Sequence, residues 1–254
     1  MLRLHNEDLA VEIDLEKGAR ISSLKWNGLE FVVPPRPSLM DWGWYAMVPW
    51  AGRIRDGVIS SSAGVIHQLP TDWDPPHAEH GFGFSSAWNQ TGDHSCELLL
   101  PEPYAGAVAR QAFSLQDNSF TWELNYEANG CDLPAWLGFH PWFKRKLEIG
   151  READLNFSAN KMLVRGTDYI PTGELVSPKQ QPWDDAFTGV TSDPSIHWEG
   201  AALVQIKSSA PWWVVYSEDK EGICVEPQTA PPDASNLGIT GAHSLRALFT
   251  FSSG

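Results

Sequence analysis

The chain has 254 residues, enough to bury a sizeable core, and its three cysteines are far apart and lack CxxC spacing. Its 18 basic and 32 acidic side chains give a formal charge of −14, which disfavours binding to nucleic acid or to anionic membranes. We see no leader-like segment at the start and no run of about 18 apolar residues. The composition predicts one domain over residues 1–254 in the reducing cytoplasm and leaves the oligomeric state open.

Period-two alternation of apolar and polar residues predicts β-strands from the beginning of the chain to its end. Residues 11–16 alternate in this way, and Asn27-Gly28 is a hairpin signal within residues 24–31. No window of about 12 residues carries a convincing apolar stripe with helical spacing and caps. Further strands are predicted within residues 120–127, 202–209, 212–217, 222–226 and 245–253. The pattern indicates an all-β fold, a sandwich of antiparallel sheets.

Four segments between these strands are rich in proline, tryptophan and acidic or imidazole side chains. Proline lowers the cost of ordering a loop, while aromatic and titratable residues supply contacts and chemistry. Aromatic faces stack on sugar C–H groups, although we expect at least half of the 13 tryptophans to fill the core. The segments are residues 33–44, 71–84, 169–187 and 226–236, and we expect them to be loops that form a binding face.

Five short motifs carry candidate functional residues, and each taken singly fits a structural role better than a functional one. The motifs are MVPWAGRIRDG around Arg53, EHGFGFSSAW around His80, LGFHPWF around His140, WDDAFTG around Asp184 and VEPQTAPPDASN around Glu226. Together and in this order they resemble the aldose 1-epimerase family, the galactose mutarotases, as does the opening segment 4–32. This resemblance implies a large antiparallel β-sandwich, the galactose mutarotase-like supersandwich, with a sugar cleft on its concave face.

The resemblance also implies an acid and base pair for opening a sugar ring, with Glu226 as the general base and His140 as the general acid, in imidazolium form. No metal or cofactor is needed for that chemistry, and the expected partner is a small neutral aldose. The remaining roles implied are hydrogen bonds to sugar oxygens from Arg53 and His80, acceptance from hydroxyls by Asp184, and a stacking wall formed by Trp142 with one of Trp44, Trp50 or Trp73.

The neighbours of His140 suggest why an ionisable residue stands in an apolar segment. We expect Gly138 to allow close backbone approach, Pro141 to hold a following turn, and the aromatic residues to exclude water. Two positions depart from the family pattern, because Gly52 stands where galactose mutarotases have Asn, and Trp142 stands where Tyr is more usual. The identity of the sugar therefore stays open.

Three alternatives remain at this point. A hexose 6-phosphate mutarotase would need a cation cluster, for which Arg36, Arg55, Lys144 and Arg145 are available, against the overall acidity. A sugar-binding module without activity would keep the cleft but not the chemistry. A metal site could use His77 and His80, although His77-Ala-Glu-His80 is not a zinc motif of the HExxH type.

Overall fold

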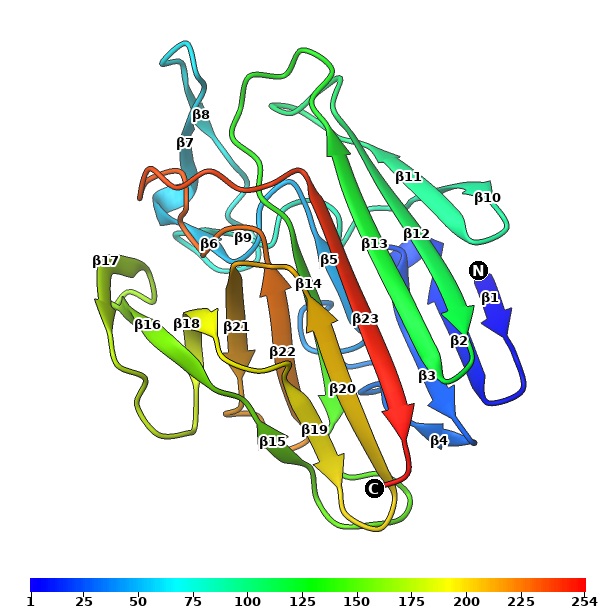
Figure 1. Cartoon of the computed structure of the whole chain (residues 1–254). Helices are drawn as coiled ribbons and strands as arrows, with labels where there is room; N and C mark the ends of the chain where they lie inside the picture. Colours follow the sequence, from blue (N-terminus) through cyan, green and yellow to red (C-terminus); the bar gives the residue numbers. More distant parts are fainter.

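The computed structural model describes all residues 1–254, and almost every regular element is a β-strand. Two large antiparallel sheets face each other across the core, which confirms the predicted all-β sandwich (Figure 1). The only helical elements are three-residue 3₁₀ turns at Leu15–Lys17 and Arg55–Gly57. None of the helical segments has the length and hydrophobicity required to cross a membrane.

The larger sheet has eleven strands, and its central strands carry the candidate site. Their spatial order is β1-β2-β3-β5-β14-β22-β21-β18-β16-β17, with β4 paired to β3. The strands are β1 (Leu2–His5), β2 (Leu9–Asp14), β3 (Arg20–Trp26), β4 (Leu29–Glu30), β5 (Trp44–Met47), β14 (Gly138–Lys144), β16 (Ala159–Arg165), β17 (Pro171–Val176), β18 (Asp184–Val190), β21 (Trp212–Tyr216) and β22 (Gly222–Gln228).

The second sheet has eight strands in the order β10-β11-β12-β13-β23-β20-β19-β15. They are β10 (Asn89–Gly92), β11 (Ser95–Leu99), β12 (Val108–Gln116), β13 (Ser119–Glu127), β15 (Asp154–Asn156), β19 (Ser195–Trp198), β20 (Ala202–Ser208) and β23 (Ser244–Ser252). Two small ribbons complete the fold, one formed by β6 (Arg53–Ile54) with β9 (Ala78–Glu79) and one by β7 (Val58–Ser60) with β8 (Ile66–Gln68). The β6–β9 ribbon lies beside the larger sheet, because β6 follows β5 after only five residues (Figure 1).

The core lies between the two large sheets as a continuous cluster of 67 buried apolar residues. Alternate residues of each strand point into it, so that Phe139 of β14 stacks on Trp122 of β13 with ring centroids 4.0 Å apart. All tryptophans except Trp73 and Trp212 are buried, which confirms that most of them fill the core. The face of the larger sheet that points away from the core carries the side chains that line a pocket.

Most predicted strands are present, including the β3–β4 hairpin whose turn residues Asn27 and Gly28 have positive φ. The first predicted strand ends earlier than expected, because β2 stops at Asp14 and a 3₁₀ turn follows. The segment 169–187 was expected to be a loop and instead contains β17 and the start of β18. β17 is an edge strand with mostly exposed residues, so its sequence lacks the apolar alternation of a half-buried strand.

Candidate active site

The candidate site is built on adjacent strands at the centre of the larger sheet. Tyr45 of β5 pairs directly with His140 of β14. On the other side of β14, the pairs Gly138 with Gln228 and Trp142 with Cys224 place His140 opposite Glu226 of β22. Because alternate residues face the core, these side chains share the opposite face of the sheet. The sheet thus brings His140 and Glu226 together from residues 86 apart in the chain.

Two prolines interrupt the hydrogen-bond ladder at this position. Pro141 and Pro227 have no N–H, and no ladder pairing joins β14 to β22 between the two pairs that flank His140 and Glu226, although the register is the same on both sides. The expectation that Pro141 holds a following turn is wrong, since it lies within β14 and pairs with Trp44. The expected role of Gly138 agrees with the structure, because a Cβ there would lie 2.5 Å from Met47 Cε and 2.7 Å from Ala51 Cβ.

His140 and Glu226 are in direct contact and are almost fully buried. His140 Nε2 lies 3.3 Å from Glu226 Oε1, and the Gln228 amide donates to Glu226 Oε2 at 3.2 Å. Burial raises the pKa of Glu226 well above its usual value and lowers the pKa of His140 to about 3. The empty site therefore favours a protonated carboxyl facing a neutral imidazole. This differs from the imidazolium assumed from the sequence, although the pair still holds one transferable proton.

Aromatic rings hold the His140 imidazole in position. Tyr45 stacks on it with centroids 4.7 Å apart, and Trp142 stacks on it at 5.5 Å. The Trp142 indole N–H donates to the Met40 carbonyl at 2.7 Å, and its ring is only 4% exposed. Trp142 lines the pocket and orients His140, and its stacking on a sugar stays a prediction. Of the other candidates for a stacking wall, Trp44 and Trp50 lie in the core, whereas Trp73 is exposed outside the pocket lining.

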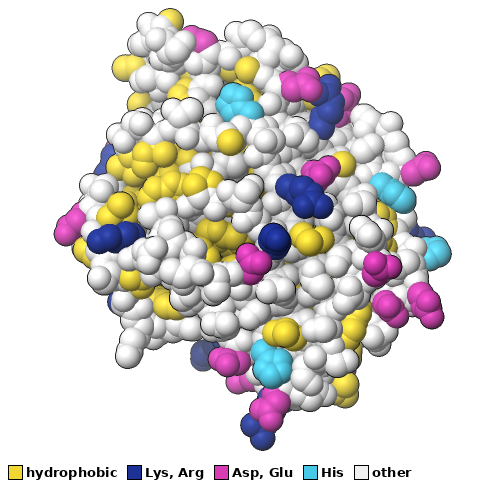
Figure 2. All heavy atoms as spheres, in the orientation of Figure 1, with side chains coloured by type: hydrophobic (Ala, Val, Ile, Leu, Met, Phe, Trp, Pro, Cys, Tyr) yellow, Lys and Arg dark blue, Asp and Glu magenta, His cyan; other side chains and the backbone are white.

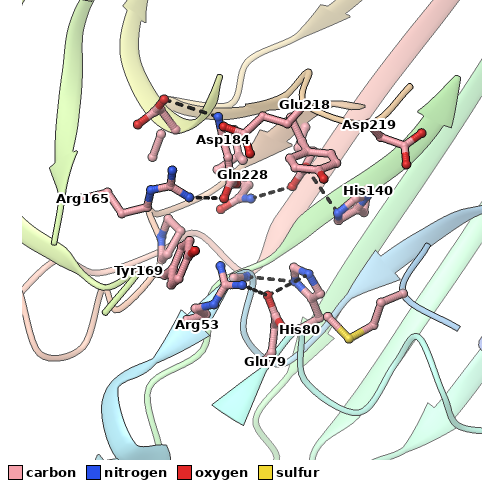
Figure 3. Close-up of a pocket in the computed structure, with 18 of the residues that line it drawn as sticks. Arg53, Glu79, His80, His140, Arg165, Tyr169, Asp184, Glu218, Asp219 and Gln228 are labelled. Atoms are coloured by element: carbon pink, nitrogen blue, oxygen red, sulfur yellow. Dashed lines mark hydrogen bonds and ion pairs between the residues drawn. The ribbon is translucent and has the colours of Figure 1, made fainter. Parts of the chain in front are cut away.

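The β6–β9 ribbon supplies a second group of charged side chains, formed by Arg53, Glu79 and His80. Arg53 Nη2 lies 3.3 Å from Glu79 Oε1, and His80 Nε2 lies 3.5 Å from the same oxygen. Asp74 accepts a hydrogen bond from Arg53 Nε at 2.5 Å on the outer side of this cluster. Figure 3 shows the three side chains gathered on one side of the pocket, across from Arg165 and Asp184.

His80 is fixed by the backbone of Gly52. The Gly52 N–H donates to His80 Nδ1 at 3.3 Å, which leaves Nε2 as the protonated nitrogen of the neutral ring, and burial lowers the pKa of His80 well below its usual value. Gly52 has a φ of 70°, and a Cβ there would lie 2.6 Å from Pro232 Cγ. The departure from the family pattern at Gly52 thus has a structural reason, because Pro232 fills the space that a side chain would need.

The third wall comes from Asp184, the first residue of β18. Its carboxylate forms an ion pair with Arg165 of β16, and the Arg165 guanidinium lies 4.9 Å from the centroid of the Tyr169 ring. These side chains approach one another in the pocket (Figure 3). Asp184 therefore faces the ribbon residues across the same hollow, and its contact with a ligand stays a prediction.

The acid and base pair, the ribbon residues Arg53, Glu79 and His80, and the third wall of Asp184, Arg165 and Tyr169 line one pocket of about 490 Å³, the size of a small-molecule site. The six predicted residues, Arg53, His80, His140, Trp142, Asp184 and Glu226, are all part of its lining. Sequence reasoning missed Tyr45, Glu79, Arg165, Tyr169 and Gln228, which also line it. Glu79 and Gln228 stand next to or within the recognised motifs, so their position was a usable signal. The other three lie in segments without a motif.

The pocket is acidic, and its cations are already paired. The arginines that line it are Arg36, Arg53 and Arg165. Arg36 binds Asp219 and Glu221 at 3.0 Å, and the other two form the ion pairs described above. The proposed 6-phosphate cluster is not assembled, because Arg55, Lys144 and Arg145 are absent from the lining.

Two groups of side chains bear on metal binding. His77 is not directed to the pocket, because its Nδ1 accepts from the Asp56 N–H at 3.1 Å and its Nε2 lies 3.1 Å from the Asp168 carbonyl. It has no free ring nitrogen for a metal. The ligand atoms of His140, Cys224 and Glu226 lie within 4.8 Å of one another, so these three buried residues could hold a thiophilic ion such as Zn²⁺.

Comparison with known proteins agrees with this geometry. The family model for aldose 1-epimerase matches residues 1–246. A putative aldose 1-epimerase from Escherichia coli K12 has a TM-score of 0.82 at 18% identity, covering 100% of this chain and 99% of that one. A galactose mutarotase-like protein from Clostridium acetobutylicum has a TM-score of 0.80 at 16% identity, with 99% and 95% covered.

A GalM/aldose epimerase homologue from C. elegans is similar over 99% of this chain and 98% of its own, with a TM-score of 0.77 and 16% identity. At these identities the structures establish the shared fold. No curated protein gives a significant sequence match to the chain.

Proposed function

The chain belongs to the aldose 1-epimerase family, and on that premise we propose that it interconverts the α and β anomers of a neutral aldose. The observation that carries this proposal is the contact between His140 and Glu226, a buried acid and base pair that lines a pocket of sugar size. Arg53, His80 and Asp184 surround this pair with hydrogen-bonding groups. The same site gives no reason to invoke a different reaction class.

The chemistry requires two proton transfers at one carbon centre. Glu226 takes the proton from the O1 hydroxyl while His140 gives one to the ring oxygen, the C1–O5 bond breaks, and C1=O1 forms. Rotation about C1–C2 and ring closure by the reverse transfers give the other anomer. Each transfer from a positioned group contributes about 10²–10⁴-fold. His80 and Arg53 stabilise charge on the sugar oxygens as the ring opens.

The pair needs one proton in total for this cycle. Burial favours the proton on Glu226 in the empty site, so it moves across the 3.3 Å contact to His140 when Glu226 is to act as the base. The reverse arrangement, with Glu226 as the acid and His140 as the base, serves ring closure. A pair that shares one buried proton therefore suits a reversible reaction whose substrate and product differ only at C1.

The charges in the pocket favour a neutral sugar over a 6-phosphate. Each lining arginine is bound to at least one carboxylate, and Asp41 and Glu218 add exposed acidic groups to the same lining. A phosphate dianion would have to displace these carboxylates and approach the others, at a cost in free energy. Hydroxyl groups instead donate to carboxylates without any displacement.

Polarimetry on freshly dissolved pure anomers tests the proposal. We expect accelerated mutarotation of at least one of glucose or galactose, and a lower kcat/KM for glucose 6-phosphate. A clear preference for the phosphate would contradict the assignment of a neutral substrate. Sugar binding without acceleration would show a binding protein that lacks the activity.

The same assay after chelation tests the metal-free mechanism. We expect activity to survive EDTA, since the proton transfers use side chains alone. Activity that is lost with EDTA and restored by Zn²⁺ would instead assign the cluster of His140, Cys224 and Glu226 to a catalytic ion.

A further inference from the structure

We propose that Glu79 is a further sugar-binding residue, whose second carboxyl oxygen bonds one hydroxyl of the ligand while its first oxygen holds Arg53 and His80. This proposal rests on the proposed function. It adds a contact to the site and predicts which hydroxyl pattern the protein recognises.

The carboxyl group of Glu79 is only half satisfied. Its Oε1 lies near Arg53 Nη2 and His80 Nε2, at 3.3 and 3.5 Å. Its Oε2 is buried and has no hydrogen-bond partner, although the side chain is 4% exposed and lines the pocket. A buried acceptor without a partner is costly, and such atoms are rare in folded proteins. A ligand hydroxyl in the pocket would supply the missing donor.

A role confined to holding Arg53 does not account for this arrangement. Asp74 already binds Arg53 Nε at 2.5 Å from the side that does not line the pocket. A second anchor for Arg53 could leave its other oxygen in contact with solvent, whereas Glu79 Oε2 is buried without a partner in a residue that lines the pocket. The β6–β9 ribbon pairs Arg53 with Glu79, so both face the ligand space from one rigid element.

The electrostatics of the pocket link this contact to a proton. Burial is the main cause that raises the pKa of Glu79 to about 7, so the group is partly protonated at neutral pH in the empty site. A hydroxyl that donates to the carboxylate stabilises its charged form and lowers that pKa. Sugar binding at pH 7 should therefore release up to about half a proton from Glu79. The charged and titratable groups that face Glu79 are Arg53 on β6, His80, Asp74, Asp41, Asp184 on β18, Glu226 on β22 and Tyr45 on β5.

The first experiment measures sugar binding by calorimetry, with glucose, galactose and their monodeoxy analogues as probes. We expect the wild type to bind one of the monodeoxy analogues about 10- to 100-fold more weakly than the parent sugar, because the missing hydroxyl leaves Glu79 Oε2 unpaired. Glu79→Ala should bind the parent sugar more weakly than the wild type does, and it should bind that one deoxy analogue no more weakly than the parent sugar. Asp74→Asn, the matched control at Arg53, should keep the wild-type pattern across the analogues.

The second experiment repeats the titration in buffers of different ionisation enthalpy, which reports the protons released. The wild type should release protons at pH 7, and Glu79→Gln, which keeps the shape of the side chain, should release fewer by the contribution of Glu79. If Glu79 only supported Arg53, the wild type and Glu79→Gln would release the same number of protons on sugar binding.

The outcomes separate this proposal from the proposed function, since binding does not require turnover. If the wild type binds sugars and Glu79→Ala keeps the same deoxy pattern, or if Asp74→Asn reproduces the effect of Glu79→Ala, the contact with Glu79 is overturned and the reaction assignment stands. If the folded wild type binds no sugar of the panel, the proposed function is overturned and this proposal with it.

Discussion

The two large sheets are made of the same kind of antiparallel strand, yet their outward faces differ in chemistry. In β13 and β23 of the eight-stranded sheet, buried residues alternate with exposed or half-buried ones. In β14 and β22 nearly every residue is buried, because the core covers one face and the pocket residues cover the other. No strand residue of the eight-stranded sheet lines the pocket.

The charges follow the same division. Figure 2 shows basic and acidic side chains scattered over the face of the molecule that the eight-stranded sheet presents to the viewer. Glu123 and Arg246 form a cross-strand ion pair on that sheet, with both side chains about half exposed. In the central strands β14 and β22 of the larger sheet the ionisable groups His140 and Glu226 are buried, and their pKa values are strongly shifted. Ionisable groups in a doubly buried strand therefore mark a functional face, while exposed pairs mark a solvated one.

The largest expected effect concerns the pair at the centre of the larger sheet. Glu226→Gln and His140→Asn should each lower kcat by about 10²–10⁴-fold, because one of the two proton transfers is lost. The double variant should be little worse than the poorer single variant, since neither group works without the other. Mutarotation kinetics measure all three, and calorimetry should show that sugar still binds.

Additive losses in the double variant would contradict this account and indicate independent positioning roles with water as the proton carrier. Near-normal activity in Glu226→Gln would remove the general base. Glu123→Gln on the eight-stranded sheet is the matched control, and its kcat should equal that of the wild type.

A smaller effect is expected on stability, from the buried carboxyl of Glu79. Its pKa is about 7 in the folded protein and near 4.5 when unfolded, so the folded state binds more protons between these values. Stability should therefore fall as pH rises through this window, by up to about 3 kcal/mol from this group. Glu79→Gln should remove that contribution, and urea unfolding between pH 4.5 and 8 measures the difference in slope.

The exposed Glu123→Gln variant provides the comparison, since it should leave the pH dependence of unfolding unchanged. Equal slopes in Glu79→Gln and the wild type would show that burial does not hold a proton on Glu79. Glu79 is one of the groups that raise the pKa of Glu226, so the difference in slope also includes the change that Glu79→Gln makes to the titration of Glu226.

The sequence predicted the sandwich, and the six residues singled out from it lie together in one pocket, for reasons that the structure makes plain. Apolar and polar residues alternate in 120–127 because one face of that strand is buried and the other is exposed to solvent. The His140 and Glu226 motifs lie in strands that are buried on both faces. The contacts that depend on distant segments could not be predicted. Nothing local to Arg165 or Tyr169 indicates that the pairing of β16 with β18 brings Arg165 to Asp184 and to the Tyr169 ring.

The protonation state of His140 could not be predicted from the sequence either. A histidine between glycine and proline gives no measure of how far water is excluded, and it is the stacking of Tyr45 and Trp142 that encloses the imidazole. The orphan oxygen of Glu79 likewise depends on where β9 lies relative to the larger sheet. Both features come from packing between elements, on which local patterns carry no information.

The smallest expected effect compares one ion pair on each sheet. Arg246→Ala removes the partner of Glu123, and because exposed pairs contribute little we expect a stability change within about 1 kcal/mol and no change in kcat/KM. Arg165→Ala removes the partner of Asp184 in the pocket, where a charge-assisted bond orients a group that faces the sugar. There we expect a loss of about tenfold in kcat/KM, mostly through KM. Polarimetry and urea unfolding on both variants measure the contrast, and added salt should reduce the stability effect of Arg246→Ala alone. Equal kinetic effects from the two arginines would show that the division between a solvated sheet and a ligand-binding sheet is wrong.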